Sequence, residues 1–504
     1  MSKCLIGCLC LMTFLGVMSM NATAQPTPPT EDLIAGHENG PWRRLFLDAM
    51  VVEQREGLAR QFHTVQKYEG NPVIRGDKPW EISGPRYKGP YIHGTVLWDE
   101  GKLRMWYRGD PGGPYNCYAE SEDGIHWRKP NLGIVEYKGS KDSNIFLSVT
   151  LDPKERPRYK GAGQCNFPCI FKQPEEKDPQ KRYALLCRAN DYRTQRVAFS
   201  PDGLHWNFVF ETAKKGLFTG GDATNYFYDP YNKRYAAAAK CTNRRGRAIG
   251  MAFSRGMNVL AWGEPTVVFV ADDLDPDAAQ IYGMPVFAYQ GMYIGLPWIY
   301  HARWFKYGEY TDQRMIEAEK DSPCTTDVQL AWSWDLINWT RTPKREPFIP
   351  LGKEGEFDSS QIYTANAPVQ VGDQLCFYYG GCDRPHNSPY TTQIGLATLR
   401  LDGFCSMHAG DREGRLISRR EVLQTPQVTI NAKTAEGGYV LCEILDRNNR
   451  VLQGFSRGDC VPFTGDSVRH VMEWKAKEFA EAQKEGEKKF RFFVKKADLY
   501  SYLP

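Results

Sequence analysis

Several features are scarce or missing in this chain of 504 residues. Charge of one sign is scarce, because 64 Lys and Arg stand against 60 Asp and Glu and leave a formal net charge of +4. A balance so near zero provides no field for holding nucleic acid, and beyond the N-terminus no run of about 18 apolar residues could span a bilayer. No C-x-x-C pair or His-rich cluster marks a zinc site. The sequence therefore predicts neither a nucleic-acid-binding nor a membrane-spanning protein.

The abundant residue types favour β-structure. Aromatic residues make up 13% of the chain, and 46 Gly and 32 Pro accompany them. Aromatic side chains are typical of strands, whereas Gly and Pro are typical of the tight turns between short strands. Long helices would require more Ala, Leu, Glu and Lys. This composition predicts an all-β protein.

The N-terminus has the pattern of an export signal. Lys3 precedes an apolar segment at 5–18, and residues 22–24 read A-T-A, an A-x-A cleavage site. We therefore expect a signal peptide at 1–24, cleaved near Ala24, and a secreted or periplasmic mature protein. Three of the 14 cysteines lie in this segment. An odd number remains, so at least one thiol stays free or pairs between chains.

A repeated turn motif organises most of the chain. Residues 121–127 read S-E-D-G-I-H-W, and residues 200–206 read S-P-D-G-L-H-W. Weaker copies lie at 254–262 and 333–339, and a degenerate fifth copy lies at 401–404. In this motif the Asp and Gly form a tight turn, and the Trp packs back onto the core of its own sheet.

Each copy of the motif follows a β-hairpin and one further strand. The predicted hairpins pair 96–98 with 103–107, 167–171 with 183–187, 225–228 with 234–240, 286–289 with 292–296, and 369–371 with 375–379. Five such units predict a five-bladed β-propeller. A flat solenoid is the competing arrangement, but only a closed ring buries both end repeats without capping units.

The pattern changes after residue 408. Segments 428–432, 439–445 and 490–494 alternate apolar and polar residues like the strands of a sandwich. The predicted organisation is therefore a signal peptide at 1–24, a leader at 25–47, a five-bladed β-propeller at 48–408, and a small C-terminal β-sandwich accessory domain at 409–504.

The repeated S-x-D-G-x-x-W hairpins resemble those of the five-bladed propeller glycoside hydrolases of the invertase and arabinanase superfamily (families 32 and 43). The C-terminal segment is similar to the sandwich that invertase-type enzymes carry. A six-bladed sialidase is a less favoured relative, because its S-x-D-x-G-x-x-W box is one residue longer. The resemblance implies hydrolysis of a glycan by two or three carboxylates on the central rim. The invertase R-D-P and E-C signatures are not recognisable in this chain.

Strand geometry locates the rim of the expected channel. The start of the first strand and the end of the second lie at the same edge of an antiparallel hairpin. The residues at the strand starts are His93, Asn166, Asp222, Tyr282 and Tyr363, and those at the strand ends are Arg108, Arg188, Lys240, Trp298 and Gly380. His301 and His386 follow shortly after the last two.

Three cationic strand ends beside aromatic rings predict a mouth suited to an anionic sugar, uronic or sulfated. Arg binds carboxylate and sulfate bidentately, and aromatic faces stack on sugar rings. Ordinary solvation of charged strand ends is the alternative. The expected ligand is an oligo- or polysaccharide, and the candidate substrate-binding residues are His93, Arg108, Asn166, Arg188, Lys240, Tyr282, Trp298, His301, Asp358 and His386.

Asp222 is the best candidate for the catalytic carboxylate. Gly220 and Gly221 before it let the backbone approach the axis closely, and turn capping is the alternative role. Glu81 is the candidate acid, because Trp80 beside it would exclude water and raise the pKa of Glu81. Asp48 is a weaker candidate, for which a solvated loop position is the alternative.

No cofactor or metal is expected, and a structural calcium ion in the channel stays an open alternative. The sequence favours a secreted glycoside hydrolase. The rival functions are a non-catalytic carbohydrate-binding propeller and a propeller that serves as a protein-interaction platform.

Overall fold

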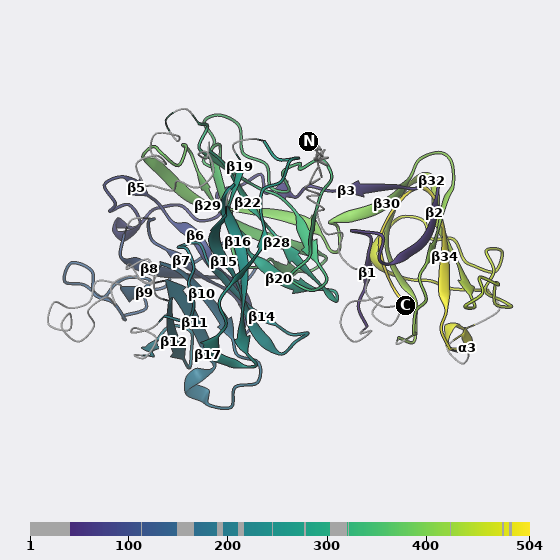
Figure 1. Ribbon diagram of the computed structural model, residues 1–504, viewed down its shortest axis with the longest axis horizontal. Helices are drawn as coiled ribbons and strands as arrows, with labels where there is room; N and C mark the ends of the chain where they lie inside the picture. The colour runs from purple at the N-terminus through teal and green to yellow at the C-terminus, as the bar shows by residue number, and fades with distance from the viewer. Residues whose placement is uncertain are drawn as a thin grey trace, which may run out of the picture.

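The computed structural model describes residues 41–111, 113–148, 166–188, 195–209, 216–243, 245–276, 279–302, 320, 322–423, 425–475, 478–482 and 486–504. Its regular structure is almost entirely β-strand, which confirms the all-β part of the predicted fold class. Figure 1 shows a rounded group of sheets and, at the right, a further sheet that contains the yellow C-terminal strands. The helical elements of the described residues are short: η3 (Pro79–Glu81), η4 (Pro179–Lys181) and α3 (Phe479–Ala482).

Four separate sheets form the blades of a propeller-like arrangement within the described residues. The first blade contains β6 (Tyr91–Asp99), β7 (Lys102–Arg108), β8 (Tyr115–Ser121) and β9 (Ile145–Ser148). The second contains β10 (Asn166–Lys172), β11 (Tyr183–Arg188), β12 (Gln195–Ser200) and β13 (Asn207–Phe208). The third contains β14 (Asn225–Asp229), β15 (Arg234–Asn243), β16 (Gly246–Arg255), β17 (Asn258–Trp262) and β18 (Thr266–Phe269). The fourth contains β20 (Val286–Tyr289), β21 (Met292–Gly295), β24 (Ala331–Ser333) and β25 (Trp339–Arg341).

The prediction of five separate blades is wrong, because the strands of the fifth repeat belong to a nine-stranded sheet. This sheet contains β4 (Gln66–Lys67), β5 (Tyr87–Lys88), β19 (Ala279–Gly283), β22 (Trp298–His301), β23 (Thr325–Val328), β26 (Gln361–Thr364), β27 (Val369–Val371), β28 (Gln374–Cys382) and β29 (Tyr390–Arg400). Pro297, which lacks an N–H donor, separates β22 from β21. The freed edge of β23 then pairs in parallel with β26 at Thr326 and Gln361 and joins the fourth repeat to the fifth.

All five predicted hairpins are confirmed. Antiparallel ladders join β6 to β7, β10 to β11, β14 to β15, β20 to β21, and β27 to β28. The outer strand beside β29 is β4, which comes from the N-terminal part of the chain. The two ends of the repeat region therefore meet in one sheet, as a closed ring requires.

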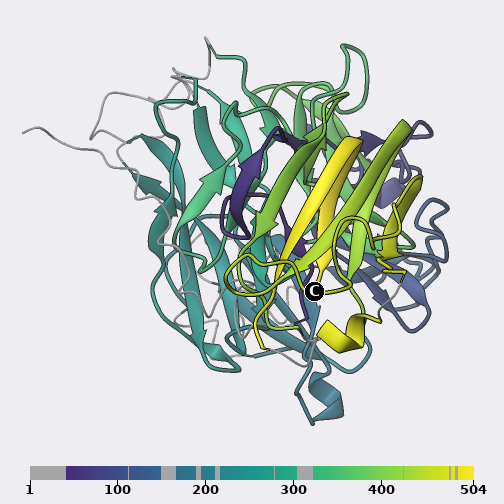
Figure 2. The same cartoon turned by 90° about the vertical axis from the view of Figure 1, so that its right-hand side faces the viewer.

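An eight-stranded sheet contains the C-terminal strands together with three N-terminal ones, β1 (Arg44–Leu45), β2 (Val52–Glu56) and β3 (Ala59–Phe62). The others are β30 (Cys405–Ala409), β31 (Gly414–Ser418), β32 (Thr429–Leu445), β33 (Asp466–Val471) and β34 (Lys489–Leu503). Strand β2 pairs with β31, and β3 pairs with β30. Strands β2 and β3 therefore belong with the C-terminal strands. The prediction had placed the chain from residue 48 onward in the propeller. The predicted β-sandwich is not confirmed, because these strands form one continuous sheet, seen in front of the propeller in Figure 2.

The repeated turn motif is structural, as predicted. In the first copy, the Ser121 hydroxyl accepts a hydrogen bond from the Gly124 N–H at 2.9 Å, and Asp123 accepts two backbone N–H bonds. The Trp127 indole donates to the Gly124 carbonyl at 3.1 Å. Asp202 and Asp335 accept the same pair of backbone bonds in the second and fourth copies.

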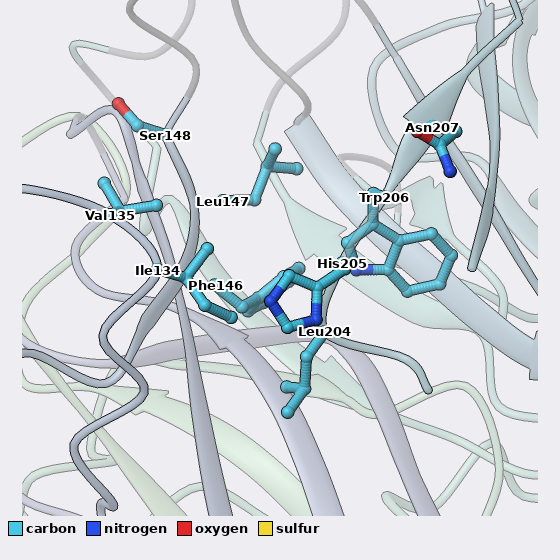
Figure 3. Close-up of a pocket in the computed structure, with 9 residues that line it drawn as sticks. All are labelled: Ile134, Val135, Phe146, Leu147, Ser148, Leu204, His205, Trp206 and Asn207. Carbon is cyan, nitrogen blue, oxygen red and sulfur yellow. The ribbon is translucent and has the colours of Figure 1, made fainter. Parts of the chain in front are cut away.

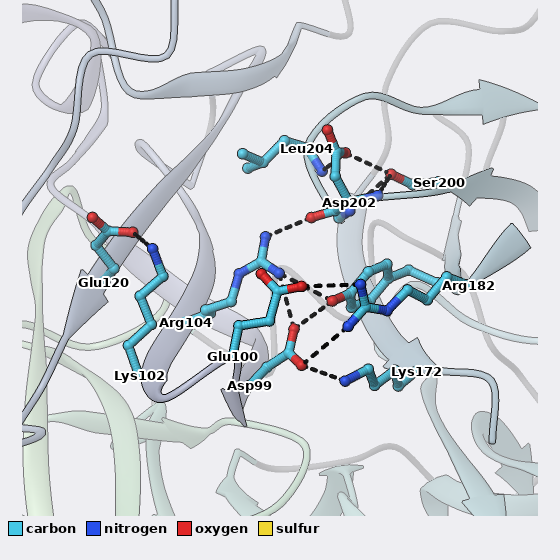
Figure 4. A network of polar contacts seen from close by, with 12 residues as sticks. Asp99, Glu100, Lys102, Arg104, Glu120, Lys172, Arg182, Ser200, Asp202 and Leu204 are labelled. Atoms are coloured by element: carbon cyan, nitrogen blue, oxygen red, sulfur yellow. Dashed lines mark hydrogen bonds and ion pairs between the residues drawn. The ribbon is translucent and has the colours of Figure 1, made fainter. Parts of the chain in front are cut away.

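A buried charge network ties the first two blades together (Figure 4). The carboxylate of Asp99, at the end of β6, accepts from Arg104 of its own blade at 3.0 Å and from Lys172 and Tyr183 of the second blade. Burial alone would raise the pKa of Asp99, but these donors lower it to about 2. The sheets therefore contact one another through ionic as well as apolar groups.

Candidate functional site

Asp222 and Lys240 form an ion pair where the third blade begins. Asp222 lies in the loop before β14, and Lys240 lies in β15, the second strand of the same sheet. The Gly221 N–H donates to the Lys240 carbonyl at 2.6 Å. A Cβ added at Gly221 would lie 2.8 Å from the Lys240 Cβ, so only glycine permits this approach. The close approach that the structure shows is to β15, whereas an approach to the propeller axis was predicted and stays a prediction.

The carboxylate of Asp222 is held in its ionised form. Burial by itself would raise the pKa of Asp222, but the Lys240 ammonium and the Arg188 guanidinium hold it well below its usual range. Arg188 is the last residue of β11 in the second blade, so cations from two sheets act on one carboxylate. Asp222 can therefore stabilise a developing positive charge, but at neutral pH it is a weak base and cannot donate a proton.

Tyr282, of β19, contacts Lys240 of this ion pair and also contacts Arg247 and His386. The Lys240 ammonium lies 4.4 Å from the centroid of its ring, and the Arg247 guanidinium lies 5.4 Å from it. The Tyr282 hydroxyl shares a hydrogen bond of 3.3 Å with Nε2 of His386. The term mouth cluster is used below for six residues that these contacts and charges connect: Arg188, Asp222, Lys240, Arg247, Tyr282 and His386.

His386 is a basic residue of the mouth cluster that is neutral at neutral pH. Burial lowers the pKa of His386, and the charges of Arg247 and Lys240 lower it further, to about 4. The ring also lies 5.4 Å from that of Tyr300 and 5.5 Å from that of Tyr282. At neutral pH His386 can accept a proton or a hydrogen bond from a ligand without adding charge.

An aromatic floor of buried rings adjoins the mouth cluster through Tyr282 and contains Tyr91, His93, Trp298 and Tyr363. The His93 ring lies 4.7 Å from Trp298 and 5.2 Å from Tyr363, and its Nε2 is 2.5 Å from the Tyr91 hydroxyl. The Tyr363 and Tyr282 rings are 5.7 Å apart. Burial lowers the pKa of His93 well below its usual value, and the charge of Arg108 lowers it further. Each floor residue is at most 5% exposed, so the floor is part of the core that packs against Tyr282.

His301, predicted to bind substrate, lies on the other face of its sheet. Its neighbour Tyr300 packs its ring against His386, and successive side chains of a strand point to opposite faces. Nε2 of His301 instead contacts the Asp327 carboxylate at 2.5 Å. Asp327 shares the face of His301, because it is paired with Ile299 across the ladder. The structure therefore does not bring His301 into the mouth cluster.

Glu81, the predicted acid, is fully buried beside the first blade. Its carboxylate accepts hydrogen bonds of 2.7 Å from the Tyr107 hydroxyl and the Lys129 ammonium, and two backbone N–H groups also donate to it. Burial raises the pKa of Glu81, in the predicted direction, although Lys129 and Tyr107 oppose the shift. Its 0% exposure gives a substrate no access. The structure does not join Glu81 to the mouth cluster.

Asp48 and Asp358 also make contacts that stabilise the fold. Asp48 accepts hydrogen bonds from the indoles of Trp332 and Trp334 at 3.0 and 2.9 Å. Asp358, which is 1% exposed, accepts from Lys67 at 2.6 Å and from Tyr379 at 2.8 Å. Neither carboxylate contacts a residue of the mouth cluster in these bonds.

Of the remaining predicted residues, Arg108 is buried at the end of β7, where its charge acts on His93. Asn166 begins β10 opposite Arg188, but its side chain lies outside the described residues.

Sequence reasoning missed Arg247, whose guanidinium contacts Tyr282, Tyr300 and Gln280. A longer predicted hairpin would have found it. Strand β15 continues past Lys240 to Thr242, and Thr242 pairs with Arg247 of β16.

Several other motifs and residue types have ordinary structural roles. Residues 454–458 read G-F-S-R-G, the G-x-S-x-G pattern of serine hydrolases, but the Ser456 hydroxyl donates to Asp459 at 2.6 Å in a turn. The described residues contain no group of three or more His, Cys, Asp or Glu placed to hold a metal ion. Ten cysteines of the described part of the chain are free thiols. None of the described helices is long and apolar enough to cross a bilayer.

Comparison with known proteins gives only distant structural likenesses. No protein-family model and no curated protein sequence matches this chain. A glycosyl hydrolase from Bacteroides ovatus is 16% identical and has a TM-score of 0.45, with 68% of this chain and 94% of that chain covered. An N-acetylgalactosamine deacetylase from F. plautii is 13% identical with a TM-score of 0.41, covering 69% and 96%. A fructofuranosidase from Schwanniomyces occidentalis is 10% identical with a TM-score of 0.41, covering 88% and 98%. Likenesses at these scores assign no activity to this chain.

Proposed function

We propose that this protein is a glycoside hydrolase that binds an anionic glycan at the mouth cluster. The observation that carries the proposal is the convergence of one ionised carboxylate, Asp222, with cations and aromatic rings from different sheets. Convergent polar groups on separate elements are typical of binding and catalytic sites. The repeated hairpins, which resemble those of propeller glycosidases, agree with this choice of reaction.

The excess of positive charge supports an acidic sugar as the substrate. Within the mouth cluster, Arg188, Lys240 and Arg247 carry positive charge, Asp222 carries the negative charge, and His386 is neutral at neutral pH. The Tyr282 and Tyr300 rings hold the Arg247 guanidinium by cation–π contacts at 5.4 and 5.0 Å. A guanidinium held in this way is pre-organised to bind a carboxylate or sulfate with two parallel hydrogen bonds.

Hydrolysis requires an ionised group on one side of the glycosidic bond and a proton donor on the other. In this proposal Asp222 is the ionised group and stabilises the positive charge that develops on the sugar ring. The proton donor is the Tyr282 hydroxyl, because His386, to which it is hydrogen-bonded, is already unprotonated at neutral pH. As the glycosidic bond breaks, the Tyr282 proton passes to the leaving oxygen. A water molecule then bonds to the anomeric carbon, and the proton it releases returns through His386 to the Tyr282 oxygen.

A non-catalytic glycan-binding propeller is the second candidate function. It is favoured by the ion pair of Asp222 with Lys240, which neutralises the one carboxylate of the mouth cluster. It is also favoured by the fold contacts of Glu81, Asp48 and Asp358, which occupy the other predicted carboxylates. Under this function the same cations and rings bind the glycan and no bond is broken.

The test compares cleavage and binding of acidic and neutral glycans. Polygalacturonate, chondroitin sulfate, xylan and β-mannan are incubated with the protein, and new reducing ends and binding are both measured. We expect cleavage of an acidic glycan, with a loss of about 100-fold or more in Asp222→Asn. The matched control is Asp229→Asn at the far end of β14, where the buried carboxylate binds Arg234 and Tyr293. The fraction of Asp229→Asn that folds should cleave the glycan as the parent protein does.

Each outcome of this test decides between the functions. Cleavage that depends on Asp222 supports the hydrolase. Binding of acidic glycans without cleavage supports the second function. The proposal would be contradicted if the protein bound and cleaved neutral glycans as well as acidic ones. Cleavage that is unchanged in Asp222→Asn would also contradict it.

Two further expectations about the whole protein belong to this proposal. The C-terminal strands form an accessory unit of the sandwich kind, supported by the separate apolar core around Phe490, Phe492 and Tyr502. The protein is exported after cleavage near Ala24 and works without a metal or cofactor, supported by the N-terminal sequence pattern and by the residue types of the mouth cluster.

A further inference from the structure

A second candidate site lies where the first two blades meet, and it shares no residue with the mouth cluster. The pocket has a volume of about 370 Å³. One wall comes from β9, the fourth and outermost strand of the first blade, and the other from the turn motif of the second blade. The volume lies within the range of about 300–1,000 Å³ that is usual for sites of small ligands.

The chemistry of the pocket differs from that of the mouth cluster. The described residues that line it include the indole of Trp206, the aliphatic side chains of Ile134 and Leu147, and the polar groups of His205 and Asn207. None of these described lining residues is Lys, Arg, Asp or Glu. An aromatic ring with neighbouring hydrogen-bonding groups and no fixed charge suits a neutral sugar.

Comparison among the repeats shows that Trp206 is unlike the other tryptophans of the turn motif. The indole donates to the carbonyl three residues earlier in the first, third and fourth repeats, at 3.1, 2.7 and 3.0 Å. In the second repeat the corresponding carbonyl, that of Gly203, accepts instead from Trp106 of the first blade at 2.7 Å. Nε1 of Trp206 therefore has no hydrogen-bond partner in the described part of the chain and is shielded from solvent.

His205 lies in front of this indole nitrogen (Figure 3). Its Nδ1 contacts the Asp202 carboxylate at 2.7 Å, and Nε2 makes no hydrogen bond with the described residues. The side chain is 65% exposed, so its Nε2 is accessible to a ligand that enters the pocket. In Figure 3 the nitrogen-bearing edge of Trp206 lies on the side of Ile134 and Phe146, which line the same pocket.

We propose that this pocket binds a neutral sugar unit, with its ring against Trp206 and its hydroxyls bonded to His205, Asn207 and the Trp206 nitrogen. A buried donor without an acceptor is unfavourable, and a sugar hydroxyl supplies the acceptor that Gly203 gives to Trp106. The site is independent of the reaction at the mouth cluster. It would hold a glycan on the protein whether or not the chain is cleaved.

The test measures binding of four neutral probes by isothermal titration calorimetry: cellohexaose, mannohexaose, xylohexaose and galactohexaose. At least one probe should bind at a single site, and Trp206→Ala should lower its association constant by about tenfold. Since loss of Trp206 also removes packing, His205→Ala and Asn207→Ala, at exposed positions, serve as second variants and should weaken the same probe.

Two control variants distinguish binding in this pocket from binding elsewhere on the protein. Trp127→Ala, at the equivalent position of the first repeat, removes an indole whose nitrogen is already paired, and should leave binding unchanged. Lys240→Met, in the mouth cluster, should also leave it unchanged. The proposal is overturned if no probe binds, if the three pocket variants bind like the parent, or if Trp127→Ala or Lys240→Met abolishes binding.

Discussion

The Lys240 ammonium is ion-paired with the Asp222 carboxylate at the start of the third blade, and this contact controls the charge of the mouth cluster. Gly221 lets the loop that contains Asp222 lie directly against β15. The pair keeps Asp222 ionised, whereas Arg188 and Arg247 on neighbouring elements supply additional positive charge. Changes at Lys240 should therefore be detected as changes in the titration of Asp222.

Lys240→Met should raise the pKa of Asp222. The ammonium stabilises the ionised form, so its removal lets the carboxyl take up a proton at higher pH. If Asp222 acts in its ionised form, the acid limb of the pH–activity profile moves to higher pH. The control is Lys172→Met, which removes a lysine that pairs with Asp99 between the first two blades. An acid limb that stays in place in Lys240→Met would show that the pair does not set this titration.

His386 should make the protein less stable as the pH falls. The pKa of His386 is about 4 in the folded protein, below the usual value of about 6.5 expected in the unfolded chain. Between these values the unfolded chain binds a proton that the native state does not bind, so the free energy of unfolding falls as pH decreases from about 6.5 to about 4. His386→Gln should reduce this loss, measured by urea unfolding at pH 7 and pH 4.5. His126→Gln, which removes an imidazole that is 86% exposed, should not reduce it.

Asp99 and Glu100 are adjacent acidic residues for which we expect very different effects on stability. Asp99 is 3% exposed and pairs with Arg104 and Lys172, so Asp99→Asn should lower the free energy of unfolding by about 3–5 kcal/mol. Glu100, whose side chain is 52% exposed, pairs with Arg182 at the surface, and Glu100→Gln should cost about 0–1 kcal/mol. Denaturant unfolding of both variants measures the difference. Because the pKa of Asp99 is about 2, its stabilising effect is lost only as the pH falls from about 4 toward 2.

Asp48→Ala should destabilise the contact between the N-terminal segment and the fourth blade. The carboxylate accepts hydrogen bonds from the indoles of Trp332 and Trp334, and both donors would lose their acceptor. We expect the free energy of unfolding to fall by about 1–3 kcal/mol in urea denaturation. Asp411→Ala, which removes a carboxylate that is 88% exposed, is the control and should change it by less than about 1 kcal/mol. Equal stability of the two variants would contradict a structural role for Asp48.

The local features of the fold could be predicted because their causes lie within a few residues. The hairpin of β6 and β7 follows from two apolar runs around a turn at Asp99, Glu100 and Gly101, and Glu100 and Gly101 both have positive φ there. The turn motif was predicted for the same reason, since Asp123 satisfies backbone donors only two and three residues away. Counting along these hairpins also found Asp222, Lys240 and Arg188.

Long-range pairing decided what could not be predicted. The parallel pair of Thr326 with Gln361 merges the fourth and fifth repeats, and neither local sequence indicates it. The expectation that His301, shortly after the counted Trp298, would bind substrate is not supported, because the face to which its side chain points depends on the register of β22 with β23 and β19. A shift of one residue in that register would exchange Tyr300 and His301 between the two faces.

The amino-acid sequence by itself determined the all-β composition and the repeated hairpins, since short-range sterics and hydrogen bonding set both. Tertiary structure alone decided that β1, β2 and β3 join the C-terminal strands, that Glu81 is enclosed, and that Arg247 reaches Tyr282. These outcomes depend on which surfaces bury one another when distant segments meet, and burial of that kind is a property of the whole packed chain.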